Sequence, residues 1–427
     1  MSEIKNKNKV NNSILRIIKI MLTGMCICLC MIFSACSSDE ATEAVNGTTN
    51  KESTNNKTTS NDINDTVSAN ASAETVPVKQ IGSMELSYAS QFKIDYYENG
   101  YAYILIGEDE EYVLVPDDMP ENDLGFENAT FIHTPFESIY LAASAAMDLF
   151  KELEIMDTIK ACSTKAEDYS IIEARERIEN NDIVYVGKYS APDYEKLLEL
   201  GTGLAIESTM IYHSPKTKEE LNDLGIPVLV ERSSYEEEPL GRLEWIKLYG
   251  LLMNKQKDAE AFFDEQVSKV NEIIDTVNRN NIQKQERPSV VFFYVSSNGY
   301  VNVRKPGDYI SKMIEMAGGR YALESLLLEE ENALSTINIS WEDFYAYAKN
   351  ADILIYNGTI DGGVESIDEL IDKNVMLTDC KAIKNHNVYC TNNNMYQETS
   401  SMGDIIVELN AIINNQSEGL KYLYKLN

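Results

Sequence analysis

The chain has few of the residue types on which several classes of function depend. Its 427 residues include three histidines, and 37 Lys and Arg stand against 69 Asp and Glu, which gives a formal net charge of −32. So acidic a chain is a poor candidate for binding nucleic acid, because phosphate contacts need clustered basic side chains. The phosphate-loop, His-Glu-x-x-His and Gly-x-Ser-x-Gly motifs are absent as well. The sequence therefore supports neither a nucleic-acid-binding function nor an enzymatic function.

Cysteine is scarce in the part of the chain that can fold. Four of the seven cysteines lie in residues 1–36, which leaves Cys162, Cys380 and Cys390. Cys380 and Cys390 could form a disulfide or stay buried thiols, and the sequence leaves both open. A disulfide framework is excluded.

The N-terminus has the order of a secretory signal. Basic residues precede an apolar run at residues 20–33, and Ser34-Ala35-Cys36 follows. This ending resembles a bacterial lipobox, although Phe33 stands where leucine is usual. We predict a signal segment over residues 1–35 and a lipid on Cys36, which would anchor the chain on the outer face of a cell membrane. A signal anchor is the alternative, but the apolar run is short for a spanning helix.

The rest of the chain predicts an α/β fold with two lobes. Residues 36–84 are mostly small and polar, which predicts a disordered tether. Residues 85–250 then alternate strand and helix patterns after a β-meander at 92–115, and residues 286–427 repeat that alternation. The first lobe is expected to begin with a strand at residues 129–133 and a helix over residues 137–152. Between them, residues 251–285 show helical spacing without glycine or proline, which predicts one long helix joining the lobes. Two successive helices packed on one core are the alternative. Mostly parallel sheets arranged in this way place a ligand cleft between the lobes.

Several short segments in this order resemble one family, the solute-binding proteins of bacterial ABC importers for iron–siderophore, haem and corrinoid complexes. They are Gly187–Leu198, Leu204–Ile206, Leu224–Val230, Ser340–Phe344 with Asn350–Ile355, and Val388-Tyr389. Gly201-Thr202-Gly203 departs from the family's Lys-Pro-Asp, and the meander is unusually extended. The resemblance implies a monomer without a cofactor that captures a metal chelate and passes it to an ABC permease with its ATPase.

The resemblance also assigns two residues to permease docking. Glu195 and Glu342 match the glutamates that the family presents to permease arginines, one on each lobe. The alternative is that both are ordinary solvated residues near helix starts, where acidic side chains are favoured.

Ligand contacts are predicted from topology, on strands and on the loops that follow them. Tyrosine and methionine suit a large flat ligand, tyrosine oxygen can bind Fe(III), and Arg or Lys can pair with carboxylates or an anionic ferric complex. The predicted ligand-binding residues are Lys188, Tyr189, Met210, Tyr212, His213, Arg232, Tyr294, Ser296, Tyr300, Arg304, Tyr356 and Tyr396.

The predicted ligand is a ferric siderophore or haem, and other ligands stay open. A corrinoid is one alternative. A bare zinc or manganese ion is another, but it would need several histidines, and only His133, His213 and His386 are present. An extracellular hydrolase is a weaker alternative.

Around residue 240 the sequence predicts structural roles. We expect Arg242 and Glu244 to make hydrogen bonds that fix the joining helix to the first lobe, and residues 236–238 to be a solvated acidic run. A stiff joining helix implies that the lobes close only slightly on binding.

Overall fold

The computed structural model describes residues 78–122, 124–126, 128–326 and 335–427, all within one unit formed by residues 73–427. The predicted signal segment, the lipidated Cys36 and the predicted tether up to residue 77 lie outside the described residues. Within the described part of the chain, no helix is long and apolar enough to cross a membrane.

A small five-stranded sheet comes first. Its strands lie in the order β1 (Gln80–Ser83), β2 (Phe92–Tyr97), β3 (Ala102–Ile106), β4 (Glu110–Val115) and β5 (Thr130–His133). β2 to β4 coincide with the predicted meander, and the turn between β2 and β3 holds Asn99 and Gly100 at positive φ, which these residue types tolerate. Two predictions were wrong here. β1 lies inside the predicted tether, and β5 was expected in the first lobe's sheet but pairs parallel to β4.

The first lobe is built on a fully parallel sheet. The strands lie in the order β12 (Val228–Glu231), β11 (Leu204–Ser208), β6 (Ile139–Leu141), β7 (Ile159–Cys162) and β8 (Val184–Tyr185). The flanking helices are α2 (Met147–Glu152), α3 (Ile172–Glu179), α4 (Tyr194–Glu199) and α5 (Pro215–Asp223), and a short hairpin joins β9 (Gly187–Lys188) to β10 (Ala191–Pro192). The predicted helix over residues 137–152 is correct only in its second half. Ile139–Leu141 is instead a buried central strand, and its apolar run is too short for its period to separate a strand from a helix.

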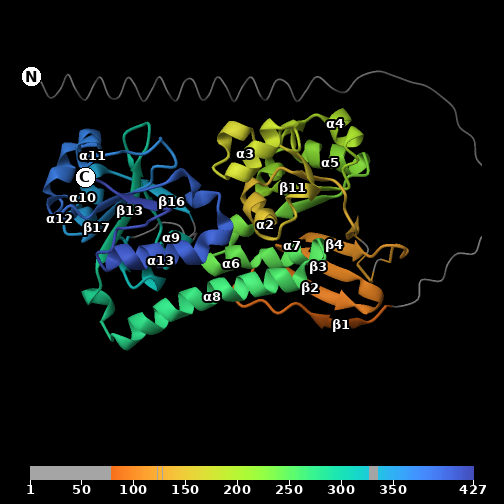
Figure 1. Ribbon diagram of the computed structural model, residues 1–427, viewed down its shortest axis with the longest axis horizontal. Helices are drawn as coiled ribbons and strands as arrows, with labels where there is room; N and C mark the ends of the chain where they lie inside the picture. The colour runs from red at the N-terminus through yellow and green to blue at the C-terminus, as the bar shows by residue number, and fades with distance from the viewer. Residues whose placement is uncertain (1–77, 123, 127, 327–334) are drawn as a thin grey trace, which may run out of the picture. The chain divides into compact units, whose positions relative to one another are not determined.

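Three helices, rather than one, join the lobes. They are α6 (Pro239–Glu244), α7 (Ile246–Leu252) and α8 (Gln256–Arg279). The long helix therefore begins at Gln256, not at residue 251, after a turn in which Asn254 has a φ of 55°. A Cβ atom on Gly250 would lie 2.6 Å from the Cβ of Ala259, so glycine there allows α7 and α8 to pack closely. α8 then runs along both α7 and α13 (Met402–Ile413), and so spans both lobes (Figure 1).

The second lobe has a mixed sheet. Its order is β16 (Thr336–Ile339), β14 (Val301–Arg304), β13 (Ser289–Val295), β17 (Ile353–Tyr356), β18 (Val388–Thr391) and β19 (Leu423–Lys425), with β15 (Arg320–Tyr321) also paired to β13. The central strands are parallel, whereas β14, β16 and β19 pair antiparallel to their neighbours. The other helices are α9 (Tyr309–Met316), α10 (Trp341–Ala348), α11 (Ile367–Lys373) and α12 (Lys381–Lys384). The predicted α/β class with two lobes and a long joining helix is confirmed.

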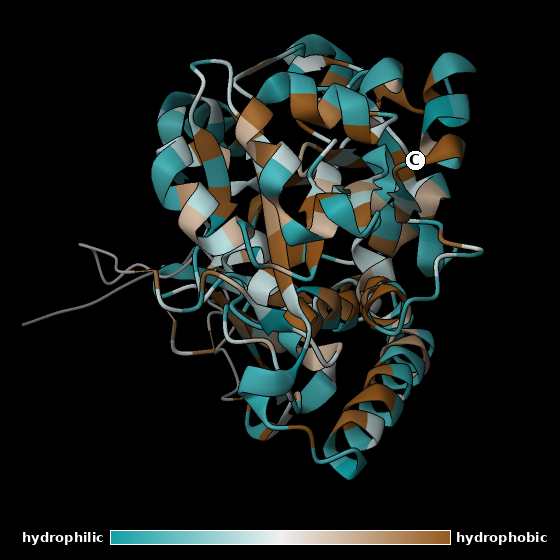
Figure 2. Cartoon of the chain, turned by 90° about the vertical axis from the view of Figure 1, so that its left-hand side faces the viewer, coloured by the Kyte–Doolittle hydropathy of each residue, from teal (hydrophilic) through white to brown (hydrophobic). Residues whose placement is uncertain are grey.

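The helices begin and end as their sequences indicate. The side chains of Asp193, Asp308 and Ser340 accept backbone N–H bonds at the starts of α4, α9 and α10. α9 ends before Gly318, which has a φ of 89°. Figure 2 shows helices that carry both hydrophobic and hydrophilic residues, as expected for helices that cover a sheet with one face.

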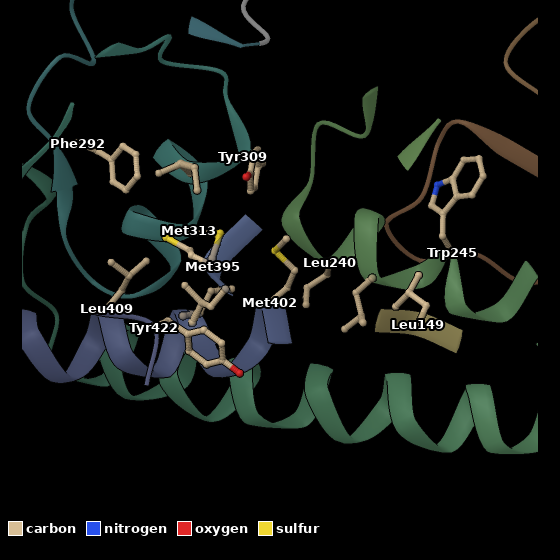
Figure 3. Close-up of a cluster of buried hydrophobic side chains, with 14 of the residues drawn as sticks. Leu149, Leu240, Trp245, Phe292, Tyr309, Met313, Met395, Met402, Leu409 and Tyr422 are labelled. Carbon is tan, nitrogen blue, oxygen red and sulfur yellow. The ribbon is translucent and has the colours of Figure 1, made fainter. Parts of the chain in front are cut away.

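A single buried apolar cluster continues from the small sheet through the first lobe and the joining helices into the second lobe. Figure 3 shows part of it, including Leu149 of α2, Leu240 of α6, Met313 of α9 and Met402 of α13. Because the lobes share this core, separating them widely would expose buried apolar surface. The shared core supports the expectation of a small closure.

A buried carboxyl group without a partner lies in the first lobe. Glu207 on β11 is fully buried, and neither of its carboxyl oxygens has a hydrogen-bond partner among the described residues. Ala205, two residues earlier and on the same face of the strand, packs in a cluster with Leu197 of α4 and Leu221 of α5. Burial raises the pKa of Glu207 to about 8. The carboxyl group is therefore protonated at neutral pH.

We predict that Glu207 makes the protein less stable as the pH rises. Its folded pKa of about 8 lies above the ordinary value of 4.5, so only the unfolded chain releases the proton between these values. The free energy of unfolding should fall over that range by at most roughly 1.4 kcal/mol per pH unit, with no further loss above it. Glu207→Gln should flatten this dependence in urea unfolding at a series of pH values. Glu219→Gln, at an exposed position on α5, should keep the wild-type slope, and an unchanged slope in Glu207→Gln would contradict the prediction.

Candidate ligand site between the lobes

Two cavities lie where loops of the two lobes meet. The smaller has a volume of about 530 Å³ and is named here the arginine–tyrosine cavity. It is lined by Ser234, Tyr235, Arg242, Arg304, Asp308, Tyr309, Ser335, Ile360 and Tyr396. The larger, of about 1110 Å³, is named the polar groove. Its lining includes Lys151, Asp168, Ser170, Arg175 and Glu176 of the first lobe, and Thr359, Asn392, Asn394, Gln397, Glu398 and Lys421 of the second. Both lie beside loops at the carboxyl ends of parallel strands, where ligands of such sheets bind.

Arg304 is the central cation of the arginine–tyrosine cavity. It is the last residue of β14, and its guanidinium carbon lies 5.3 Å from the ring centre of Tyr396 and 5.8 Å from that of Tyr309. Its Nη2 donates a hydrogen bond to the Tyr396 hydroxyl, and its Nη1 lies 3.5 Å from a carboxylate oxygen of Asp308. Burial alone would lower the pKa of Arg304, but the nearby Tyr396, Tyr309 and Asp308 more than offset this and raise it. Arg304 is a permanent cation whose side chain is only 13% exposed.

Tyr309 and Tyr396 stay protonated in this cavity. Burial raises the pKa of Tyr396 and of Tyr309, although the neighbouring arginines lower both pKa values in part. Their hydroxyl groups can therefore donate and accept hydrogen bonds at neutral pH.

Arg242 brings a second cation from the joining helices. Its guanidinium carbon lies 3.7 Å from the centre of the Tyr309 ring, and its Nη2 donates to the Ser234 carbonyl at 2.7 Å. Its Nε is buried and has no hydrogen-bond partner among the described residues. The cavity thus holds two arginines and one aspartate, a net positive lining in a chain whose formal net charge is −32. Such a cavity favours an anionic ligand with flat groups.

The structure brings Arg304 and Tyr396 together from the predicted ligand-binding set. Arg232 lies next to the cavity instead. Its guanidinium carbon is 4.8 Å from the Tyr235 ring centre and its Nη2 is 3.5 Å from the Gln91 side chain, so it faces the small sheet. Tyr235 and Arg242 line the cavity but are not among the predicted ligand-binding residues. Tyr235 lies in the loop after β12, which the topological rule does select, whereas Arg242 was expected to be structural.

The other predicted ligand-binding residues of the first lobe line neither cavity. Lys188 is exposed on β9, and Met210, Tyr212 and His213 are exposed on the 3-10 helix Thr209–His213. Tyr189 packs against that lobe's own core.

In the second lobe the remaining members line neither cavity, and the Tyr300 side chain is exposed. Tyr356 is fully buried and its hydroxyl donates to Asp361 at 2.5 Å. Tyr294 packs against the shared core. The hydroxyl of Ser296 donates to the Tyr300 carbonyl at 2.8 Å, which closes the turn between β13 and β14.

The expectation of a solvated run at residues 236–238 was wrong for Glu236. This side chain is fully buried and accepts hydrogen bonds from the backbone N–H groups of Ser90 (2.7 Å) and Gln91 (2.9 Å) and from the Trp245 indole (2.9 Å). Glu244, also fully buried, accepts from backbone N–H groups at residues 87–89. We call Glu236, Glu244 and residues 87–91 the carboxylate clamp. It fixes the segment between β1 and β2 to α6 and the residues just before it.

Both predicted docking glutamates are exposed. Glu195 lies on α4 of the first lobe and Glu342 on α10 of the second, and these helices are well separated in Figure 1. Neither carboxylate has a hydrogen bond or ion pair with the described residues.

The described residues contain no group of three or more His, Cys, Asp or Glu side chains placed to hold a metal ion. His133 pairs with Glu121 at 3.0 Å, and His213 and His386 are exposed. Cys162, Cys380 and Cys390 are free and buried, so the pairing of Cys380 with Cys390 that the sequence left open does not occur.

Two lobes of α/β structure, a long joining helix and ligand-sized cavities between the lobes define a two-lobed binding protein. The family profile described as periplasmic binding protein matches residues 142–395. Since this is more than half of the chain, the chain belongs to the periplasmic binding protein family. It is a substrate-binding protein of ABC transport and not an enzyme. The small sheet precedes the matched region.

Solved structures share this fold at low identity. A periplasmic haem-binding protein of Pseudomonas aeruginosa is 16% identical, with a TM-score of 0.53 over 68% of this chain and 98% of that one. The periplasmic haem-binding protein HutB of Vibrio cholerae is 16% identical, with a TM-score of 0.51 over 64% of this chain and 98% of that one. The petrobactin-binding protein YclQ of Bacillus subtilis is 14% identical, with a TM-score of 0.51 over 66% and 92%.

Relatives by sequence include lipoproteins of Methanocaldococcus jannaschii whose functions are not characterised. One is 21% identical over 356 residues, which cover 78% of this chain and 82% of the relative. Another is 23% identical over 383 residues, which cover 87% and 93%. These matches extend the resemblance beyond the shared lobes.

Proposed function

We propose that this chain captures a ferric siderophore or haem in the arginine–tyrosine cavity and delivers it to an ABC permease. The observation that carries the proposal is the local excess of positive charge, from Arg242 and Arg304 against Asp308, in a strongly acidic chain. Anionic carboxylates or ferric chelates would be attracted there, and the tyrosine rings would contact their flat parts. The cavity of about 530 Å³ is of the size that holds small ligands. Structural neighbours that bind haem or petrobactin are consistent with this ligand class.

The test is quenching of intrinsic fluorescence against haemin, ferric siderophores, cobinamide and Zn(II). The chain has two tryptophans, and Trp245, which donates to Glu236 of the carboxylate clamp, directly follows α6, which carries Arg242. Saturable quenching with a submicromolar midpoint by haemin or one ferric chelate is the expected result. A response to cobinamide alone would transfer the proposal to corrinoids, and a response to Zn(II) alone would contradict the cavity assignment.

We also propose that Cys36 carries the lipid that holds the protein at the outer face of the membrane. The lipobox-like ending of the signal segment and the lipoprotein names of the relatives support this. Metabolic labelling with a fatty acid should mark the wild-type chain and not Cys36→Ala.

Reversing the charge of both predicted docking residues should abolish transport while ligand binding survives. In Glu195→Lys/Glu342→Lys, repulsion from permease arginines replaces attraction, and both sites are exposed and remote from the cavity. Uptake of the labelled ligand by cells and the Kd of the purified protein are the two measurements. Glu179→Lys/Asp368→Lys, which reverses one exposed acid on each lobe, should transport normally. Loss of ligand binding in the docking variant would show that these residues are misassigned.

A further inference from the structure

A short stretch between β18 and α13 crosses from the second lobe to the first. We name residues 396–400 the crossing segment. The side-chain oxygen of Gln397 in this segment accepts hydrogen bonds from the backbone N–H (2.7 Å) and the hydroxyl (2.9 Å) of Ser170. The amide nitrogen of Gln397 donates to the Asp168 carbonyl at 2.7 Å. Both the oxygen and the nitrogen of the Gln397 side-chain amide are therefore hydrogen-bonded to the first lobe.

Two further residues of the crossing segment bond to the first lobe. The Thr399 hydroxyl donates to the Ala145 carbonyl at 3.0 Å. The backbone N–H of Ser400 donates to a carboxylate oxygen of Asp148 at 2.9 Å, and its hydroxyl donates to the same oxygen. Asp148 is fully buried and lies 3.2 Å from the Lys151 ammonium group. Lifting the segment would leave this buried carboxylate with fewer partners, which is costly.

The same segment contributes a residue to each of the two cavities. Tyr396 lines the arginine–tyrosine cavity and bonds to Arg304, while the next residue, Gln397, lines the polar groove. Because Tyr396 and Arg304 both belong to the second lobe, the crossing bonds fix the position of Tyr396 relative to the first-lobe lining residues Ser234 and Tyr235.

We propose that Gln397 and Ser400 are positioning residues that hold Tyr396 in the ligand cavity and set the rate of ligand release. Their bonds to Ser170 and Asp148 break when the lobes separate, and the crossing segment then moves as one piece with Tyr396. The statement about release rests on the proposed function of the cavity, whereas the crossing bonds themselves can be tested without ligand.

The ligand-free test is amide hydrogen exchange on the full chain. Ser400→Ala removes the hydroxyl bond to Asp148, and we expect faster exchange both in residues 392–401 and around Ser170 in the first lobe, which Ser400 does not contact. Ser401→Ala is the matched control, because its hydroxyl accepts from Tyr422 at 2.6 Å within the second lobe. The control should leave exchange around Ser170 unchanged. A Ser400→Ala protein with wild-type exchange around Ser170 would overturn the proposal.

The ligand test is the dissociation rate of haemin, measured by transfer to excess apomyoglobin. Ser400→Ala and Gln397→Ala should release haemin about tenfold faster, as expected for loss of a bond to a charged or buried group. The absorption spectrum of bound haemin should stay as in the wild type, because neither residue contacts it, and Ser400→Thr should restore the rate. Equal rates in the wild type and both variants would overturn the release step. Absence of haemin binding by the wild type would count against the proposed ligand, while the exchange experiment would still decide the crossing bonds.

Discussion

Arg304→Ala is expected to weaken the binding of haemin or a ferric siderophore about 100-fold, the largest loss from any single change in the cavity. Arg304 is largely buried, with 13% of its side chain exposed, and is permanently charged and held near the Tyr396 and Tyr309 rings. Truncating a buried, hydrogen-bonded charge that faces an anionic ligand costs roughly 2–5 kcal/mol, and each 1.4 kcal/mol is tenfold in affinity. Titration of the purified variant by fluorescence quenching or calorimetry measures the change in Kd.

Two further variants make this test specific. Arg304→Lys keeps the charge but loses the planar fork and the stacking on tyrosine, so its affinity should lie between those of the wild type and Arg304→Ala. Arg320→Ala removes an arginine of the same lobe that pairs with Glu324 outside both cavities, and its affinity should match the wild type. An Arg304→Ala protein that is folded and binds within threefold of the wild-type Kd would exclude this cavity as the ligand site.

Glu236→Ala is expected to lower the free energy of unfolding by about 3–5 kcal/mol, since breaking one side of a buried charged network leaves several donors unsatisfied. The wild-type carboxylate accepts from Ser90, Gln91 and the Trp245 indole, and the side chain is fully buried. These donors belong to the segment between β1 and β2 of the small sheet and to the helices that join the lobes. Losing the carboxylate should therefore loosen the sheet from α6 as well as lower the stability.

The neighbouring Glu237 provides the control for this change. Its side chain is 65% exposed and lies 3.7 Å from Lys312, a surface pair worth at most about 1 kcal/mol, so Glu237→Ala should unfold nearly as the wild type does. Urea unfolding followed by tryptophan emission compares the two variants, and Glu236→Gln, which keeps part of the acceptor capacity, should fall between them. Equal unfolding midpoints for Glu236→Ala and Glu237→Ala would contradict the role of the clamp.

The predicted secondary structure is correct where the spacing of apolar residues and the helix-capping residues indicate the same element. Helices α4, α9 and α10 begin at the polar residues that the sequence shows, and strands β7, β11, β12 and β17 match runs of buried apolar residues. The errors fell where a local pattern is ambiguous. Ile139–Leu141 is too short for its period to separate strand from helix, and the turn at Asn254 contains neither glycine nor proline to mark it.

The candidate site was predictable only in part. Arg304 and Tyr396 followed from the rule that ligands meet residues near strand ends, but the same rule also selected Tyr356, whose hydroxyl is bonded within its own lobe to Asp361. Arg242 was expected to be structural because it lies at the start of the joining helices, and it does bond to the Ser234 carbonyl. Its ring partner, Tyr309, comes from the other lobe, and no local pattern predicts that contact.

The sequence by itself determined the α/β lobes, the long amphipathic helix and the family, because these depend on local spacing and on short ordered motifs. Only the tertiary structure decided which side chains meet, since Asp148 and Ser400 are 252 positions apart and Ser170 and Gln397 are 227 apart. The tertiary structure also decided which charged side chains are buried. Glu236 and Glu237 are adjacent and chemically identical, yet one is buried under backbone N–H groups from residues 90 and 91 and the other faces solvent. The burial of a carboxylate is set by segments distant in the chain, because these supply the donors that offset its desolvation.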